Sequence, residues 1–351
     1  MTTPINTPPI STAGSASPAI LVPNTTTTTP VSQANDFYTA LSAELTACES
    51  VFTLTAEDGD APDTDALQVW LNGRDDVKSA SWEKTSYGDS AEFKFTITYR
   101  QEAVLICAYR SGDATKLTSV ERDALAETRR VVASVIQPEM SEYEKEKAIH
   151  DYIVTTCEYD SGDLTGGTVP ENAYTPYGVL IDKKAVCDGY SSTFKLFMDM
   201  LGIECVTVRG SAGGEGHSWN LVKIAGEWYW IDVTWDDPVY LDGQMPPAGI
   251  RYDWFNVTDS VINKNHQPDS APDVICSSTA YNYFYYNDLV AGSGDELRSM
   301  LKKSAERGDT YISLLYMGIP LSNDKLSSLF PPSVYLFNND PDTDVVTVYF
   351  H

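Results

Sequence analysis

The stretch AVCDGYSSTFKLFMDMLGI at residues 185–203 places a cysteine where loop-like sequence becomes a helical pattern. From Cys187, apolar and aromatic residues recur at spacings of three and four as far as Leu201, which predicts one packed helix face, and Gly202 is a suitable stop. Cys187 therefore lies in the first turn. Free N–H groups at a helix N-terminus stabilise an anion, so a thiolate there would be a good nucleophile, with donors beside any carbonyl that it attacks.

A nucleophile needs a base, and the chain has four histidines. The runs HSWNLVKI and EWYWIDVTW flank Ala225-Gly226 and predict a hairpin with a two-residue turn. Ile224 then pairs with Glu227, and this register places His217 and Asp232 diagonally on one face. Asp232 could hold the imidazole in one tautomer and stabilise its protonated form. A slip of one residue would put the two side chains on opposite faces.

Other interpretations of these residues stay open at this level. Cys187 could be a small buried side chain or half of a disulfide, and a strand histidine is often a satisfied core residue. A zinc site built from Cys187, Cys205, His217 and Asp232 is conceivable, but no compact ligand spacing supports it. We therefore expect no metal and no cofactor.

The other candidate groups are typical of structural roles. The six cysteines form no CxxC pair, and Cys107, within AVLICAY, is typical of a small buried apolar residue. We expect His150 to be a core or interface histidine of an amphipathic helix, and His266, in NKNHQP, to be a loop residue with a turn or packing role. The acidic run DPDTD at 340–344 is typical of solvated sequence.

The elements that must position Cys187, His217 and Asp232 can be predicted from local patterns. AEFKFTITY alternates as a half-buried strand with Phe93 and Tyr99 on one face. Capping boxes that begin at Thr118 and Ser141 predict two helices, and Ser293 begins a third. We predict four regions: a disordered Thr/Pro/Ser-rich linker at 1–35, a small α+β module at 36–117, the catalytic domain at 118–275 and a C-terminal α/β module at 276–351.

Charge and composition limit the partners. Twenty-four basic and fifty acidic residues give a formal net charge of −26, a field that repels phosphate backbones, so we expect no nucleic-acid partner. No apolar run approaches the roughly 20 residues that a membrane helix needs, so we expect no transmembrane segment. The uncharged segment 1–35 is typical of a stalk, which favours an extracellular or cell-surface-tethered protein whose leader is not present in this sequence.

Taken together, YGVLIDKKAVCDGYSSTFKLFMDMLGIECVTVRG and HSWNLVKIAGEWYWIDVTWDDP resemble the bacterial transglutaminase-like superfamily, of papain-type architecture. Its signature is V-C-x-G-Y where a loop becomes a helix, then H-x-W-N on one strand and W-Y-x-x-D-x-T-W on the next. The resemblance covers roughly residues 118–275. It implies an α+β fold in which the helix with the nucleophilic cysteine packs on an antiparallel sheet, with small α+β modules on either side.

The resemblance also implies roles for individual residues. Cys187 would be the nucleophile, His217 the general base and acid, and Asp232 the residue that orients His217. Tyr177 and Gly178 are expected to line a substrate groove.

Three further residues qualify this picture. Trp219 is a substrate-binding candidate that packing also explains. Lys183 and Lys184 stand where members of the family often have a glycine, which leaves the shape of the loop before Cys187 open.

The chemistry implied is amide acyl transfer through a thioester on a protein or peptide substrate, with cell-wall peptide as one candidate. Water as acceptor gives a cysteine peptidase or amidase, which we favour, and a lysine amine gives a crosslinking transglutaminase. The alternative from another class is a catalytically silent binding or scaffold module on a surface stalk. The oligomeric state is left open by the sequence.

Overall fold

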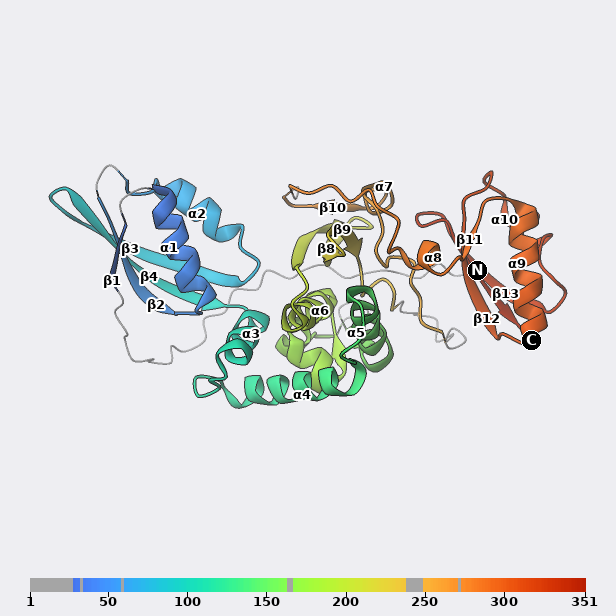
Figure 1. Cartoon of the computed structure of the whole chain (residues 1–351), viewed down its shortest axis with the longest axis horizontal. Coiled ribbons are helices and arrows are strands. Elements are labelled where there is room, and N and C mark those ends of the chain that lie inside the picture. Colours follow the sequence, from blue (N-terminus) through green and yellow to red (C-terminus); the bar gives the residue numbers. More distant parts are fainter. Residues whose placement is uncertain (1–27, 32–33, 58–59, 163–166, 238–248, 271–272) are drawn as a thin grey trace. The chain divides into compact units, whose positions relative to one another are not determined.

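The computed structural model describes residues 28–31, 34–57, 60–162, 167–237, 249–270 and 273–351 (Figure 1). The chain divides into two compact units, one that ends at Arg129 and one that extends from Arg130 to His351. The described residues form three four-stranded sheets with the orders β1-β2-β4-β3, β10-β7-β8-β9 and β11-β12-β14-β13, and a small pair β5-β6. The fold class is α+β, as the sequence predicted.

The first unit packs two helices on one sheet. Its elements are β1 (Thr28–Val31), α1 (Ala34–Thr46), β2 (Val51–Glu57), α2 (Thr64–Asn72), β3 (Val77–Tyr87), β4 (Ser90–Tyr99) and α3 (Gln101–Ser111). The alternating residues of β4 are buried as predicted, and they share a core with leucines of α1 and α2. Of the predicted linker, the structure describes only β1, which pairs in parallel with β2, and the start of α1; the rest lies outside the described residues.

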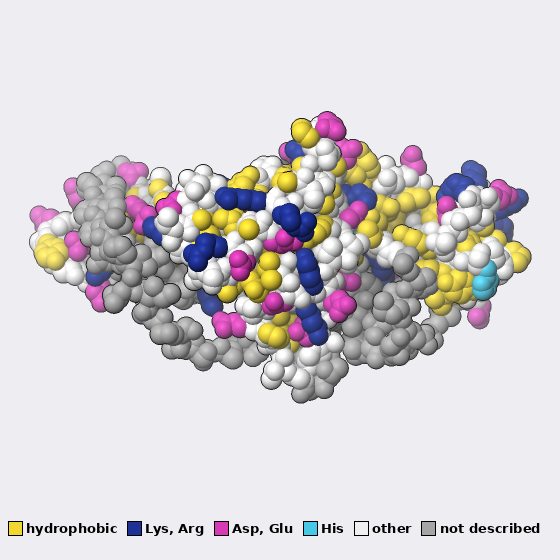
Figure 2. Space-filling view, turned by 90° about the horizontal axis from the view of Figure 1, so that it is seen from below, with side chains coloured by type: hydrophobic (Ala, Val, Ile, Leu, Met, Phe, Trp, Pro, Cys, Tyr) yellow, Lys and Arg dark blue, Asp and Glu magenta, His cyan; other side chains and the backbone are white. Residues whose placement is uncertain are grey.

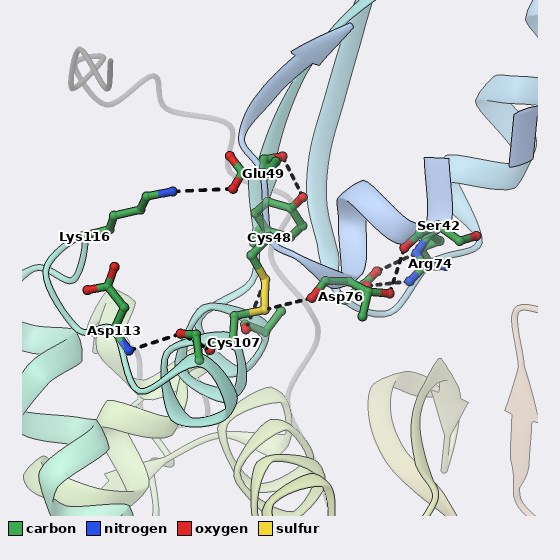
Figure 3. Close-up of a disulfide and its surroundings, with 12 residues drawn as sticks. Ser42, Cys48, Glu49, Arg74, Asp76, Cys107, Asp113 and Lys116 are labelled. Carbon is green, nitrogen blue, oxygen red and sulfur yellow. Dashed lines mark hydrogen bonds and ion pairs between the residues drawn. A yellow bond between two sulfur atoms is a disulfide. The ribbon is translucent and has the colours of Figure 1, made fainter. Parts of the chain in front are cut away.

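A disulfide joins Cys48, just beyond α1, to Cys107 within α3 (Figure 3). The interpretation of Cys107 as a small unpaired core residue is therefore wrong. The two cysteines are 59 positions apart, and neither has a local sequence signal for pairing. They meet because α3 returns to the end of α1, where Tyr99 also donates to the backbone oxygen of Glu49 at 2.9 Å.

The second unit begins within α4 (Ser119–Val135) and centres on α6 (Cys187–Leu201), which packs on the antiparallel strands of the middle sheet (Figure 1). Its other elements are α5 (Glu142–Thr156), β5 (Glu158–Tyr159), η2 (Glu171–Tyr174), the π-helix η3 (Gly178–Asp182), β6 (Lys184–Ala185), β7 (Cys205–Ala212), β8 (Glu215–Ile224), β9 (Glu227–Ile231), α7 (Asp259–Ile262) and β10 (His266–Pro268). Helix α6 ends at Gly202 in the left-handed conformation, as predicted. The Ser141 capping box also forms.

The hairpin register predicted from the Ala225-Gly226 turn is confirmed. Ile224 pairs with Glu227, and the pairing continues to Asn220 and Ile231. Both turn residues have positive φ, 50° and 89°, which is the two-residue turn that matches strand twist. This register carries His217 and Asp232 to the same end of the sheet.

A glycine allows the short edge strand β10 to approach β7. Gly210 lies opposite His217 across β7 and β8, and a Cβ on Gly210 would meet the backbone oxygen of Gln267 at 2.1 Å. Because Gly210 carries no side chain, β10 can pair antiparallel with β7 and bring His266 next to Ala212. Residue His266 is thus on a strand, and its interpretation as a loop residue is wrong.

The C-terminal module packs helices on the third sheet. Its elements are α8 (Tyr283–Tyr286), β11 (Val290–Ala291), α9 (Gly294–Arg307), β12 (Tyr311–Tyr316), α10 (Asn323–Ser327), β13 (Val334–Asp340) and β14 (Val345–Phe350). Ser293 caps α9 as predicted. The acidic turn between β13 and β14 is not merely solvated: Asp342 accepts from Nδ2 of Asn265 at 2.8 Å, and Asp344 pairs with Lys264 at 3.0 Å.

Among the described side chains on the face shown in Figure 2, basic residues stand between acidic and apolar ones instead of gathering in one patch. In the part of the chain that the structure describes, none of the helices combines the length and apolarity needed to cross a bilayer.

Candidate active site

Cys187 is the first residue of α6, and only 2% of its surface is exposed. The turn around it is closely packed, because a Cβ on Gly189 would lie 2.4 Å from the backbone oxygen of Ala173. The first N–H groups of the helix have no carbonyl partner within it, so they point outward beside the thiol. This is the position from which a thiolate would be stabilised and an oxyanion bound.

His217 lies on β8 and is fully buried. Its Nε2 atom is 2.7 Å from Oδ2 of Asp232, which leaves Nδ1 as the nitrogen available to Cys187. Burial opposes a charge on the ring, but the carboxylate of Asp232, with a smaller contribution from Cys187, raises the pKa of His217 to about 10. Nδ1 makes no well-aligned hydrogen bond among the described residues, as is common for a catalytic base without substrate.

Asp232 follows β9 and accepts four hydrogen bonds. Oδ1 accepts from the backbone N–H groups of Thr234 at 3.0 Å and Trp235 at 3.1 Å, and Oδ2 faces the Nε2 atoms of His217 and His266 at 2.7 and 3.0 Å. Burial disfavours the charged carboxylate, yet His217 and His266 hold the pKa of Asp232 well below its usual range. The group is therefore a fixed anion at the centre of the site.

His266 is the functional candidate that the sequence interpretation missed. It is 1% exposed, and Trp219, Trp235 and Trp254 surround it with ring centroids 4.9, 4.5 and 4.9 Å away. Nothing local to NKNHQP indicates this environment. The available signal was Gly210, since a glycine inside a strand often marks the close approach of another backbone.

The three groups His217, Asp232 and His266 also form the one cluster within the described residues that could hold a metal ion. The Nε2 atoms of both histidines contact Oδ2 of Asp232 directly, at hydrogen-bonding distances. Cys205 is not part of the cluster, because it lies at the other end of β7, opposite Val222. In the structure, Asp232 thus joins the two histidines by hydrogen bonds.

The segment after β9 anchors the neighbouring helices as well. Asp236 accepts from the buried His150 of α5 at 3.0 Å, and Asp237 accepts from the hydroxyl of Tyr190 on α6 at 2.6 Å. Burial opposes charge on His150, but Asp151 and Asp236 raise its pKa to about 9. One short run of acids therefore fixes the positions of α5 and α6 relative to the carboxylate of Asp232.

Tyr159 is a second residue that sequence reasoning missed. Strand β5 pairs in parallel with β6, which places Tyr159 beside Ala185, two residues before Cys187. The ring is 8% exposed, and its hydroxyl is buried with no hydrogen-bond partner among the described residues. Burial, and next the charge of Cys187, raise the pKa of Tyr159, so the phenol remains a donor near the thiol.

The three candidate substrate-binding residues have different environments. Tyr177 is half-buried and immediately precedes η3. Gly178 is buried, and a Cβ at this position would collide with the backbone of Asn172 and Ala173. Trp219 is 1% exposed and its ring is near-parallel to that of His217, with centroids 5.9 Å apart. Gly178 and Trp219 are thus buried and Tyr177 is partly exposed, and their contact with a substrate stays a prediction.

Lys183 adopts the conformation that a glycine would favour. Its φ is 57° at the end of η3, and its ammonium donates to the hydroxyl of Tyr152 at 3.0 Å. The loop before Cys187 therefore keeps a left-handed backbone without a glycine, and the side chain is held by Tyr152.

Residues 129–233 match the family model described as the transglutaminase-like superfamily. The chain contains a transglutaminase-like domain. The matched segment of this domain includes Cys187, His217 and Asp232 and ends before His266.

Two curated relatives share part of this sequence. A mouse protein named kyphoscoliosis peptidase is 31% identical over 154 residues, 40% of this chain and 23% of its own length. The human kyphoscoliosis peptidase is 29% identical over 117 residues, 30% of this chain and 17% of its own length. The match thus spans less than a quarter of either relative. A solved structure described as a TGase is 20% identical, with 57% of this chain and 55% of that chain covered and a TM-score of 0.31.

Proposed function

We propose that the domain is a thiol-dependent amide acyl-transfer enzyme that acts on protein or peptide substrates, most simply as a cysteine peptidase or amidase. The observation that carries the proposal is the contiguous set of Cys187 at a helix start, His217 with its Nδ1 left available, and Asp232 on the far side of the ring. The name of the two relatives, kyphoscoliosis peptidase, supports hydrolysis.

In the acylation step, the Cys187 thiolate attacks the amide carbonyl carbon and the carbonyl electrons move to oxygen. The N–H groups at the start of α6 and the hydroxyl of Tyr159 are the donors placed to bind that oxyanion. The C–N bond then breaks, and the imidazolium of His217 gives its Nδ1 proton to the departing amine. A thioester remains on Cys187.

In the second step, His217 removes a proton from a water molecule, which attacks the thioester carbonyl and releases the acid and the Cys187 thiolate. Asp232 keeps Nε2–H directed away from the thiol throughout, so the same nitrogen, Nδ1, exchanges the proton in both steps. If a lysine amine replaces water, the product is an isopeptide crosslink. Water as the ever-present acceptor favours hydrolysis.

We further propose that the protein works in an oxidising, extracellular or cell-surface setting. The Cys48–Cys107 disulfide supports this, because stable disulfides are uncommon in reducing compartments. The uncharged Thr/Pro/Ser-rich composition of residues 1–35 supports a tether. Surface proteolysis of intact cells, with the chain detected by antibody before and after, tests this placement: a protected chain would count against it.

The chemistry is tested by alkylation with limiting iodoacetamide at about pH 6, followed by peptide mapping. A small reagent is needed because Cys187 is nearly buried. The other free cysteines are internal controls: burial raises the pKa of Cys157 and of Cys276 to about 12, so these thiols stay protonated. We expect rapid labelling confined to Cys187 and slowed in a His217→Ala variant.

Hydrolysis is then measured with fluorescein-labelled casein, and transamidation by incorporation of dansylcadaverine into dimethylated casein. A Cys187→Ala variant should lose either activity. Equal, slow labelling of all the free cysteines, with no activity that depends on Cys187, would remove the enzyme proposal and leave the binding-module alternative.

A further inference from the structure

The hydrogen bonds around Asp232 continue beyond the three proposed catalytic residues. Nε2 of His266 lies 3.0 Å from Oδ2 of Asp232, and Nδ1 of the same ring lies 2.5 Å from Oδ1 of Asn265. Nδ2 of Asn265 donates to Oδ2 of Asp342 at 2.8 Å. A continuous line of contacts therefore joins Asp232 to the β13–β14 turn of the C-terminal module.

Each contact in this line has a defined direction. Asp342 can only accept, so it takes the amide hydrogens of Asn265 and turns the oxygen of that side chain toward His266. Oδ1 of Asn265 and Oδ2 of Asp232 are both acceptors, so His266 makes both hydrogen bonds only as the protonated ring, which donates from Nδ1 and from Nε2. Asp342, three contacts away from Oδ2 of Asp232, thereby selects the orientation of the Asn265 side chain.

The imidazole of His266 contacts Oδ2, which is the oxygen of Asp232 that also faces His217. Oδ1 is already fixed by two backbone N–H groups, and His217 is the moving partner at Oδ2. His266 reaches Oδ2 from β10, the strand at the other edge of the sheet from β9, so Oδ2 lies between two ring nitrogens. The buried setting makes both bonds to Oδ2 stronger than they would be in water.

The surroundings of His266 are otherwise apolar. The titratable groups that face it are Asp232 after β9, His217 on β8 and Asp342 in the β13–β14 turn. Burial lowers the pKa of His266, and Asp232 opposes that shift. The rest of the ring contacts the indoles of Trp219, Trp235 and Trp254.

We propose that His266 is a positioning residue for Asp232, and that Asn265 and Asp342 hold it in place, so that the C-terminal module completes the active site. This inference rests on the proposed acyl-transfer function. It assigns a role to two segments that lie outside residues 129–233, the part matched by the family model. The C-terminal module is then required for full activity even though it supplies no group to the substrate.

The test uses the full chain with variants at both ends of the line. His266→Phe keeps an aromatic ring among the tryptophans but removes both nitrogens, and Asp342→Ala removes the acceptor for Asn265. Asp342→Asn retains an acceptor oxygen and serves as the conservative rescue. Asp344→Asn is the matched control, because Asp344 is in the same turn but only forms an exposed ion pair.

We expect His266→Phe to lower kcat for casein hydrolysis by about 100-fold with little change in KM, as for a small displacement of a catalytic group. Asp342→Ala should lower it about 10-fold. Asp342→Asn and Asp344→Asn should stay near the wild-type rate. In addition, the ring titration of His217, followed by NMR of the four histidines, should be displaced in His266→Phe and Asp342→Ala but not in Asp344→Asn.

The outcomes separate the two proposals. Hydrolysis that depends on Cys187 but is unchanged in His266→Phe and Asp342→Ala overturns the positioning role and leaves the proposed function standing. An inactive wild-type protein removes the proposed function, and the His217 titration then decides the contact line alone: if the titration is the same in all variants, the line does not exist. Thermal midpoints identify any variant that has simply unfolded.

Discussion

Replacement of Asp232 by asparagine changes few atoms but breaks the hydrogen-bond pattern of the site. All four contacts of Asp232 come from donors: two backbone N–H groups at Oδ1 and two imidazole nitrogens at Oδ2. An asparagine has one oxygen and one amide nitrogen. Whichever way the amide is turned, its NH2 group faces two other donors. The arrangement that keeps the backbone bonds loses both His217 and His266.

The magnitude follows from the pKa of His217. Burial alone lowers it, and Asp232 is the largest of the contributions that raise it from 6.5 to about 10. A rise of this size corresponds to stabilisation of the imidazolium on the order of 5 kcal/mol. Without the carboxylate, the pKa of His217 should fall below 6.5, so the ring is neutral at pH 7. Activity should fall about 10³- to 10⁴-fold, as when a triad aspartate becomes asparagine.

The assay is the second-order rate of Cys187 alkylation by iodoacetamide from pH 5 to 10, together with casein hydrolysis. In Asp232→Asn the fast labelling at low pH should disappear. Asp199→Asn is the matched control, since Asp199 lies in the last turn of α6 and pairs with Lys195. A folded Asp232→Asn protein with the wild-type labelling profile and hydrolysis rate would refute the assignment of Asp232 as the group that charges and orients His217.

Three further predictions concern burial, the disulfide and the oxyanion. Burial raises the pKa of Glu146 to about 8, so its contribution to stability is greatest below the unfolded value of 4.5 and is lost as the pH rises from 4.5 to 8. Glu146→Gln keeps an acceptor for Asn256 and should therefore gain up to about 3 kcal/mol at pH 7 and little at pH 4, measured by denaturant unfolding; equal midpoints at both pH values would contradict this. Removing the disulfide with Cys48→Ser and Cys107→Ser should destabilise the first unit by about 4 kcal/mol, since the crosslink spans 59 positions; an unchanged unfolding curve would show that the bridge is not formed. Tyr159→Phe removes an unpartnered hydroxyl and should lower kcat about 10²-fold without lowering the thermal midpoint; a wild-type kcat would exclude the hydroxyl as a donor to the oxyanion.

The parts of the site that the sequence predicted are those set by local rules. A two-residue turn with positive φ at Ala225 and Gly226 determines the register, and the register determines which face carries His217 and Asp232. The start and end of α6 follow in the same way from periodicity and Gly202. Each of these inferences uses only residues that lie close together in the sequence, within a single hairpin or a single helix.

The parts that were missed depend on contacts between distant segments. His266 reaches Asp232 across 34 positions through a three-residue edge strand, too short to show alternation. The hydroxyl of Tyr159 is placed by a two-residue parallel pairing. Cys48 and Cys107 meet only because α3 returns to α1, and the acidic turn at 340–344 looks solvated until Asp342 is seen beside Asn265. The composition of a short segment does not predict which distant segment will pack against it.

The disulfide also has a practical consequence for handling the protein. The first unit contains a Cys48–Cys107 bridge, while the proposed chemistry requires Cys187 as a free thiol. Strong reductants such as dithiothreitol, which are routinely added to protect cysteine catalysts, would open the bridge. Buffers without any reductant leave Cys187 exposed to capping by small disulfides, which is reversible. Purification and assay therefore call for a buffered thiol–disulfide mixture, and the activity tests described above apply to protein prepared in that way.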